Sequence, residues 1–180
     1  MTVRARTLAG LTLALVVGVV AAPKTAPVPA QAKLLAFNAQ AKALLAKMTL
    51  EEKVAQMTQP DQLFIKDATE IEKYGFGSVL SGGDSDPKTN TVEDWGAMYE
   101  KYQAHALKSR LKIPLLYGVD AVHGHSNVIG AVMFPHNVGL GATHNPKLLG
   151  DIARATAQQV RTTGIEWTFA PTVTVPQDDR

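Results

Sequence analysis

The stretch Ile113-Pro114-Leu115-Leu116-Tyr117-Gly118-Val119-Asp120 is the clearest sign of fold class in this sequence. An uncharged, mostly apolar run that ends in one carboxylate is typical of a buried strand that stops at the edge of a sheet. Residues 75–80 form a second apolar segment, and residues 165–175 form a third with a break at Pro171. Helical patterns lie between these segments. Because parallel strands need a crossover connection, the alternation predicts a parallel α/β domain.

The residues before the first predicted strand indicate two helices. Apolar residues recur at helical spacing over residues 33–48, which predicts an amphipathic helix. Thr49 and Glu52 then have the three-residue spacing of a capping box. We expect them to start a short helix that buries Val54 and Met57.

Two longer helices are predicted between the strands. Thr91 with Asp94 is a weaker form of the capping box and starts a helix over residues 92–109. Asn145-Pro146 supplies a favourable N-cap and first helical position, and Gly164 is a natural end for that helix. The residues that we expect to face inward are Trp95, Met98, Tyr102, Leu107, Leu149, Ile152, Ala153, Ala157 and Val160.

The composition limits the classes of function that are possible. Hydrophobic residues make up 46% of the 180 residues, which favours a packed domain over disorder. The chain contains no cysteine, so disulfides, thiolate metal sites and a cysteine nucleophile are excluded. The remainder of the chain after residue 32 is close to neutral, and it therefore has no electrostatic footprint for nucleic acid or an anionic membrane.

The first 32 residues have the pattern of a secretory signal peptide. Arg4 and Arg6 form a positive start, and Leu8–Ala22 follows without a charge. We favour cleavage after Ala30-Gln31-Ala32 over cleavage after Val20-Ala21-Ala22, since prolines keep the intervening stretch extended. The sequence therefore predicts a signal peptide at 1–32, a mature chain at 33–180, and a periplasmic or secreted protein with no membrane attachment after cleavage. An uncleaved membrane anchor is the alternative.

Asp120 is the first candidate for a functional residue. In parallel α/β folds, ligands bind at the carboxyl ends of the strands, and Asp120 occupies such an end. An aspartate there accepts two hydrogen bonds from adjacent hydroxyls, which suits a sugar. The alternative is that Asp120 only caps a loop or a helix.

His123 and His125 form a second candidate, in a long polar loop over residues 121–143. Two histidines with one residue between them supply half of a metal site, which His136 and Asp120 would complete. The alternative, which we favour, is that these histidines bond to the loop's own backbone and tie it together.

The number of strands favours an incomplete barrel. A (β/α)8 barrel takes roughly 250 residues. Residues 33–180 supply about three strands, and the chain ends directly after the third. We therefore expect the N-terminal part of a (β/α)8 TIM-like barrel, truncated after about three strands. An open doubly wound sheet is the alternative fold.

The sequence resembles the start of the family 3 glycoside hydrolases, the β-glucosidase and exo-β-glucanase group. The matching stretches occur in order and at family-like spacing from about residue 48 to the end. They are Met48–Met57, Gly77–Gly83, Ile113–Gly124, Phe134–Thr143, Phe169–Pro171 and Asp179-Arg180.

The resemblance implies a (β/α)8 first domain, usually followed by an α/β sandwich domain. It also implies hydrolysis of β-glucosidic bonds that releases glucose from the non-reducing end with retention, and no metal or other cofactor. Asp120 matches the aspartate that bonds the outer hydroxyls of the terminal glucose. Arg180 matches only the first arginine of the family's R-W-G-R motif, so sugar contact is not assigned to it.

The resemblance further implies that the nucleophile and the acid/base carboxylate lie beyond Arg180, so that this chain alone is inactive. The expected partner is a β-glucoside or β-glucan oligosaccharide. Two other functions stay open at this point. One is a metal-dependent hydrolase barrel that uses His123 and His125, and the other is a non-enzymatic periplasmic sugar-binding protein.

Overall fold

The structure is a computed structural model that describes residues 33–172. The chain divides into two compact units, 1–41 and 42–180, and each is considered by itself. The predicted signal peptide at 1–32 and Arg180 lie outside the described residues. Within residues 33–172, no helix has the length and apolar character needed to cross a membrane.

The predicted helix over residues 33–48 is present in a shorter form. Residues 33–35 are helical, and α2 spans Asn38–Leu45 across the boundary between the two units. No residue of α2 is buried. The amphipathic spacing therefore identified a helix, but not a buried face.

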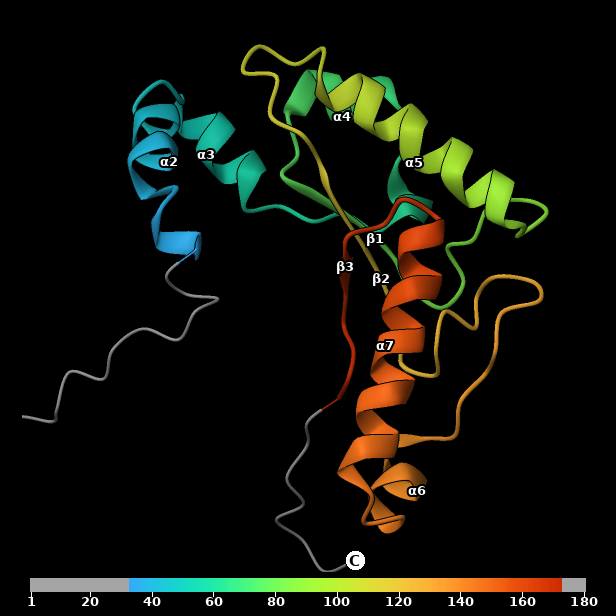
Figure 1. The fold of residues 1–180 in the computed structure, drawn as a ribbon. Coiled ribbons are helices and arrows are strands. Elements are labelled where there is room, and N and C mark those ends of the chain that lie inside the picture. Colours follow the sequence, from blue (N-terminus) through green and yellow to red (C-terminus); the bar gives the residue numbers. More distant parts are fainter. Residues whose placement is uncertain (1–32, 173–180) are drawn as a thin grey trace, which may run out of the picture. The chain divides into compact units, whose positions relative to one another are not determined.

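The second unit contains a three-stranded parallel sheet, as the sequence predicts (Figure 1). The strands are β1 Ser78–Ser81, β2 Leu116–Val119 and β3 Trp167–Thr168, in that order across the sheet. Ser81 pairs with Val119, and Gly118 pairs with Trp167. The carboxyl ends of all three strands therefore meet at one edge. A small parallel sheet of this kind is consistent with the predicted barrel domain.

The helices of this unit follow the predicted order, with additional short elements. They are α3 Leu50–Gln56, η1 Gln62–Phe64, α4 Thr69–Tyr74, α5 Val92–Ala106, α6 Asn137–Ala142 and α7 Pro146–Thr162. The sequence pattern did not predict η1, α4 or α6, which are too short to show helical periodicity. The apolar segment over residues 75–80 predicts a strand that begins at residue 75. Gly75 instead ends α4 at a φ of +70°, and β1 begins three residues later.

The predicted helix caps are confirmed. The Thr49 amide donates to Glu52 Oε2 at 2.8 Å, and the Glu52 amide donates to Thr49 Oγ1 at 3.2 Å. Asn145 Oδ1 accepts from the Leu148 amide at 3.1 Å at the start of α7. Gly164 follows that helix at a φ of +84°, a conformation that glycine adopts without strain. These local patterns therefore fix the ends of the helices.

The hydrophobic core lies on one face of the sheet. Val79, Tyr117 and Val119 point from the strands into a cluster that also holds Trp95 and Tyr102 of α5, both predicted to be buried. The predictions for other positions are wrong. Val54, Met57 and Leu107 are 52%, 80% and 48% exposed, and Leu149, Ala153 and Ala157 are also exposed. In α3 the buried residue is Ala55 instead, because spacing alone does not say which face a neighbour covers.

The opposite face of the sheet carries Gly118 and Trp167. A Cβ atom at Gly118 would lie 2.0 Å from Cε3 of Trp167, so the indole packs directly on the glycine. The Trp167 ring meets Phe169 edge-on, with 4.2 Å between the ring centroids. Leu116 on the same face is exposed. This face is therefore apolar and leads to the edge at which Asp120 lies.

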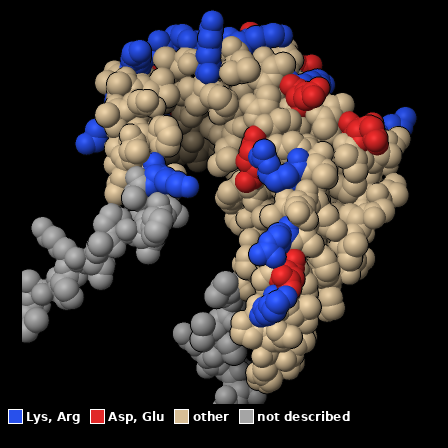
Figure 2. All heavy atoms as spheres, in the orientation of Figure 1, with Lys and Arg blue, Asp and Glu red and all other residues tan. Residues whose placement is uncertain are grey.

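Helix α7 carries paired charges on its surface. Asp151 accepts from Lys147 at 2.7 Å and from Arg154 at 3.0 Å, and all three side chains are exposed. Figure 2 shows basic and acidic side chains next to one another over this helix. This surface is therefore of mixed charge and does not form a field of one sign.

Candidate functional site

Asp120 lies directly after β2, at the carboxyl edge of the sheet, as predicted. The Asp120 amide donates to Ser81 O of β1 at 3.3 Å, and the Asp120 carbonyl accepts from Asn127 Nδ2 at 3.3 Å. Its side chain is partly buried. Within residues 33–172, no donor is bonded to its carboxylate. The backbone of Asp120 is therefore fixed, while both carboxylate oxygens are free to accept bonds from a ligand.

Thr168 of β3 fixes the chain on both sides of Asp120. The Thr168 hydroxyl donates to Val119 O at 2.8 Å and accepts from the Ala121 amide at 3.1 Å. The Phe169 amide also donates to Val119 O, at 3.2 Å. Strand β2 ends at Val119, and the Thr168 hydroxyl bonds the backbone on both sides of Asp120. Asp120 is therefore held by β1 through its amide and by β3 through its two neighbours.

Asp61 brings a second carboxylate to the same edge. Its Oδ1 accepts from the Leu63 amide at 2.8 Å. Its Oδ2 accepts from Ser85 Oγ at 2.8 Å and from the Gly82 amide at 3.3 Å. The sequence pattern does not indicate Asp61, because Gly82 and Ser85 lie more than 20 residues away from it and its local role is only that of the cap of η1.

Asp61 and Asp120 both reach Gly82, the first residue after β1. A Cβ atom at Gly82 would lie 3.2 Å from Asp61 Oδ2 and 3.9 Å from Asp120 Oδ2. The missing side chain therefore leaves space next to both carboxylates. The site therefore consists of the ends of β1 and β2 and the segment that contains Asp61.

A buried pair of hydroxyl groups lies next to the site, on β1 and β2. Ser81 Oγ and the Tyr117 hydroxyl are 2.7 Å apart and buried. Burial raises the pKa of Tyr117 above its ordinary value. Burial also raises the pKa of Asp86, whose Oδ2 accepts from Asn90 Nδ2 at 2.9 Å. The Tyr117 phenol therefore stays protonated at neutral pH and serves as a fixed partner for Ser81.

His123 and His136 serve the long loop after β2. His123 Nδ1 lies 3.1 Å from Phe134 O, which confirms the interpretation that this side chain ties the loop to its own backbone. His136 Nδ1 accepts from the Val138 amide at 3.3 Å and caps α6. The two rings are 5.5 Å apart, and each has a nitrogen engaged in the loop.

His125 belongs to the core rather than to the loop. It is 0% exposed, its Nε2 lies 3.2 Å from Thr163 Oγ1, and its ring meets Trp95 edge-on at 5.1 Å. Burial lowers its pKa to about 4, so it is neutral at neutral pH. The part of the chain that the structure describes contains no group of three side chains placed to hold a metal ion. His123 and His125 are therefore directed to different partners.

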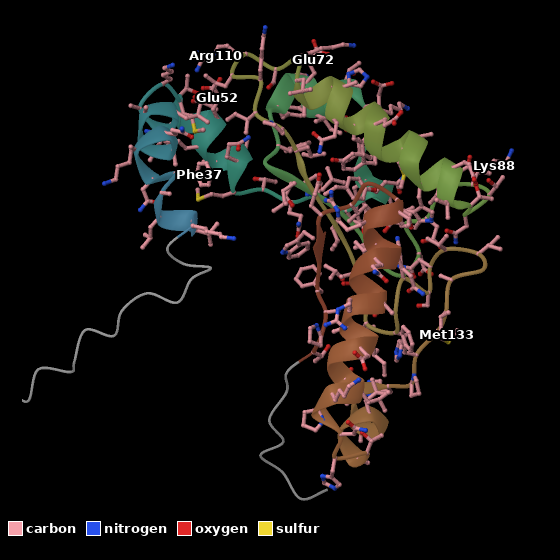
Figure 3. The ribbon with its side chains drawn as sticks, viewed as in Figure 1. Phe37, Glu52, Glu72, Lys88, Arg110 and Met133 are labelled. Carbon is pink, nitrogen blue, oxygen red and sulfur yellow. The ribbon has the colours of Figure 1, made fainter. Side chains whose placement is uncertain are left out.

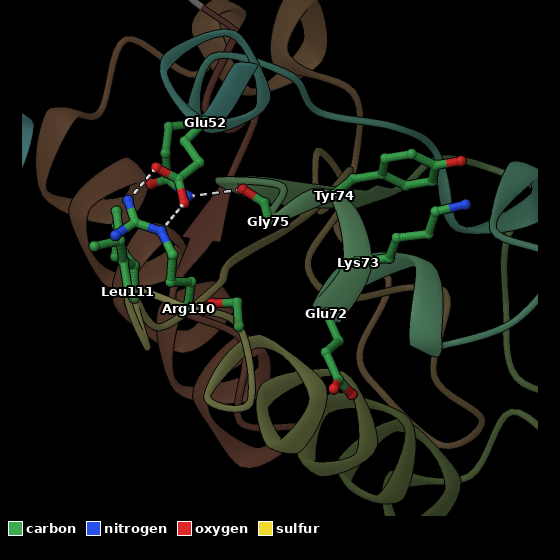
Figure 4. A pocket seen from close by; sticks show the side chains of 10 residues that line it. Glu52, Glu72, Lys73, Tyr74, Gly75, Arg110 and Leu111 are labelled. Atoms are coloured by element: carbon green, nitrogen blue, oxygen red, sulfur yellow. Dashed lines mark hydrogen bonds and ion pairs between the residues drawn. The ribbon is translucent and has the colours of Figure 1, made fainter. Parts of the chain in front are cut away.

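A separate cavity of about 110 Å³ lies at the amino end of the sheet (Figure 4). Arg110 crosses it and bonds Glu52 twice, from Nε at 2.7 Å and from Nη2 at 2.5 Å. Figure 3 shows these two side chains pointing toward each other. Gln56 Nε2 donates to Gly75 O at 2.9 Å in the same cavity. Arg110 and Glu52 are thus paired with each other within the protein, and the amino end of a barrel serves stability rather than catalysis.

In (β/α)-barrel enzymes the active site lies at the carboxyl edge of a parallel sheet, and Asp61 and Asp120 lie at that edge here. The model of the glycosyl hydrolase family 3 N-terminal domain matches residues 49–180. The chain belongs to glycosyl hydrolase family 3, and it is thereby a member of the glycoside hydrolases.

Two curated relatives are β-glucosidases by name. The lysosomal beta glucosidase of Dictyostelium discoideum is 35% identical over 147 residues, which cover 71% of this chain and 18% of that protein. The periplasmic beta-glucosidase of Salmonella typhimurium is 32% identical over 137 residues, which cover 76% of this chain and 16% of that protein. This chain therefore spans less than a fifth of the length of either relative.

Solved structures agree with the family. The exo-1,3/1,4-beta-glucanase of a Pseudoalteromonas species is 47% identical, with a TM-score of 0.74 over 80% of this chain and 18% of that chain. A beta-N-acetylhexosaminidase from Beutenbergia cavernae has a TM-score of 0.56 at 23% identity, over 70% of this chain and 38% of that one. The second similarity supports the fold alone.

Proposed function

We propose that this chain is the sugar-binding part of a β-glucosidase-type hydrolase. The enzyme would release terminal non-reducing β-D-glucose from β-glucosides or β-glucans with retention of configuration. The observation that carries the proposal is Asp120, whose backbone is held from both sides while its carboxylate is free of donors within residues 33–172. The names of the relatives, two β-glucosidases and an exo-β-glucanase, support the substrate class.

The carboxylate of Asp120 is suited to bind two adjacent hydroxyls of a glucose ring. Ionised acceptors form hydrogen bonds of about 1.5–3 kcal/mol each, more than neutral groups form. Bonds that strengthen in the transition state would contribute to turnover as well as to binding. Asp120 would thus hold the terminal sugar in the reactive position.

The chemical step requires two further carboxyl groups. A retaining glycosidase uses a nucleophile and an acid/base residue about 5–5.5 Å apart. Asp61 is engaged with Leu63, Gly82 and Ser85, so it is not free to attack a sugar carbon. We propose that both catalytic carboxylates lie beyond Arg180 in a complete barrel and a following domain. The 180-residue chain alone should therefore not hydrolyse an aryl β-glucoside.

The test uses the full-length product of the gene with an aryl β-glucoside. We expect Asp120→Ala to lower kcat/KM by about 10²–10⁴-fold, because two charge-assisted bonds are lost in the transition state. Asp120→Asn should recover part of this loss, since the amide keeps one acceptor. Asp151→Ala, which removes a surface carboxylate on α7, is the control and should change kcat/KM less than about twofold.

Three results would contradict the proposed function. The first is near-normal kinetics for Asp120→Ala. The second is a full-length product that hydrolyses no β-glucoside. The third is release of the α-anomer of glucose first, when the product is followed by NMR.

We also propose that the protein is exported, with residues 1–32 as a signal peptide that is removed before Lys33. The uncharged run Leu8–Ala22 and the small residues Ala30 and Ala32 support this. N-terminal sequencing of the protein from the periplasm or the medium should begin near Lys33. An intact Met1 in the cytoplasmic fraction would contradict export.

A further inference from the structure

We propose that Asp61 is a positioning residue of the glucose site, which fixes the first turn after β1 so that Gly82 forms one wall of the site beside Asp120. The inference rests on the proposed function, because it assumes that Asp120 binds sugar. It concerns a residue in a segment that precedes every predicted strand.

The backbone places Asp61 at the same edge of the sheet as Asp120. Leu80 of β1 donates from its amide to Pro60 O at 3.0 Å, and Asp61 forms a parallel bridge with Leu80. Asp61 therefore runs alongside β1 on the side away from β2, close to the strand's carboxyl end. Its side chain reaches the edge from a part of the chain that forms no regular strand.

The hydrogen bonds of Asp61 show how it acts. One oxygen accepts from Leu63 and so starts η1, while the other accepts from Gly82 and Ser85. Ser85 is 1% exposed, so the Ser85 hydroxyl is committed to the protein and anchors the carboxylate. Because both oxygens of Asp61 already accept bonds, Asp61 acts through the Gly82–Ser85 turn rather than on the substrate.

Gly82 explains why the position of this turn matters. A single methyl group there would lie 3.2 Å from Asp61 Oδ2, 3.8 Å from Ser85 Oγ and 3.9 Å from Asp120 Oδ2. It would fill the space next to the carboxylate that binds the sugar. Glycine lets the backbone approach a ligand closely, and Asp61 holds the glycine at that place.

The experiment compares four variants of the full-length product with an aryl β-glucoside. Asp61→Asn should raise KM about tenfold or more with a smaller change in kcat, because the amide keeps only one acceptor oxygen and its NH2 group then faces a donor on the other side. Ser85→Ala should raise KM by a smaller factor, and the double variant should be no worse than Asp61→Asn, because the two side chains share one bond. Gly82→Ala removes no bond and should also raise KM about tenfold.

Asp67→Asn is the matched control. Asp67 accepts from the Thr69 amide two residues later at 2.7 Å, as Asp61 accepts from Leu63, but Asp67 is exposed and lies at the start of α4. This variant makes the same change from carboxylate to amide at the same kind of local cap, without touching the site. Its KM should stay within about twofold of the wild-type value.

The outcomes separate this inference from the proposed function. If Asp120→Ala lowers kcat/KM strongly while Asp61→Asn and Gly82→Ala leave KM within twofold, only the role of Asp61 is wrong. An equal rise in KM for Asp67→Asn would also overturn the role of Asp61, because the same change far from the site would then have the same effect. If Asp61→Asn does not fold, the KM values of Ser85→Ala and Gly82→Ala test the inference instead, since both variants keep the bond from the Leu63 amide to Asp61. If Asp120→Ala is neutral or the wild type is inactive, the proposed function fails and this inference fails with it.

Discussion

The two ends of β1 differ in what they do, although a glycine stands at each. Gly77 precedes the strand, its amide donates to Ala55 O at 3.0 Å, and a Cβ atom there would lie 2.2 Å from Gln56 O. Gly82 follows the strand and stands between two carboxylates. At the amino end the missing side chain permits backbone to pack on backbone, whereas at the carboxyl end it leaves space beside Asp120. The same residue type therefore serves stability at one end and the site at the other.

The polar groups at the two ends show the same difference. At the amino end, Arg110 bonds Glu52 and also the carbonyl of Lys47 at 2.7 Å, so its charge is used within the fold. At the carboxyl end, the backbone around Asp120 is bonded but its carboxylate is free within the described residues. A cavity whose arginine is already bonded to a glutamate is therefore a weaker sign of a ligand site than one unbonded carboxylate on a fixed backbone.

The largest effect is expected at Gly77, at the amino end of β1. We expect Gly77→Ala to lower the free energy of unfolding by about 3 kcal/mol, because the new methyl group meets the backbone of Gln56, which has no rotamer to change. Chemical denaturation of the full-length product measures this loss. Gly83→Ala is the control, since a Cβ atom there meets nothing within 4 Å. Equal stability of the two variants would show that the amino end adjusts freely.

The stability contributed near the two ends of the sheet should be lost in different pH windows. His125 follows the carboxyl end of β2 in sequence and lies in the core, where burial lowers its pKa to about 4. The unfolded chain binds a proton there near pH 6.5 and the folded chain does not, so stability is full above pH 6.5 and falls as the pH drops toward 4. The loss reaches about 3 kcal/mol at most.

Thermal unfolding of the wild type and of His125→Gln between pH 7 and pH 4 tests this effect. The variant should be less stable at pH 7 and should lose less stability on acidification. Parallel pH profiles for the two proteins would show that His125 does not cause the acid sensitivity.

The smallest effect is expected at the amino-end ion pair. The Arg110 guanidinium, followed by the Thr49 amide, lowers the pKa of Glu52 to about 2. This pair stabilises the fold above about pH 4.5, and its contribution is lost as the pH falls toward 2. The pair is solvent-exposed, so Arg110→Gln should lower the thermal midpoint at pH 7 by only about 2–4 °C or less. The difference should shrink in high salt, and a difference that salt leaves unchanged would argue against an ionic cause.

Local patterns in the sequence predicted the features that depend on neighbouring residues. The caps at Thr49 and Asn145 and the place of Asp120 at the end of a strand follow from residues a few positions apart. The parallel sheet follows from the alternation of apolar segments and helices. The family resemblance is confirmed over residues 49–180.

Features that depend on distant partners could not be predicted. Asp61 meets Gly82 and Ser85 only after β1 has taken its place, and no motif near residue 61 indicates these bonds. Thr168 acts on β2 through a register that the sequence does not state. The exposure of Val54 and Met57 has the same cause, since helical spacing defines two faces and only the packing selects one.

The bonds of Thr168 have a consequence for the order in which the molecule forms. The Thr168 hydroxyl bonds the amide of Ala121 and the carbonyl of Val119, which precede it by 47 and 49 positions. The whole of α7 lies between them in the sequence. β1, α5 and β2 are close in sequence and lose less chain entropy when they associate than distant segments do. During synthesis, Asp120 leaves the ribosome well before the residue that anchors its backbone. We therefore expect the site to be completed late in folding, after α7 has brought β3 to the sheet.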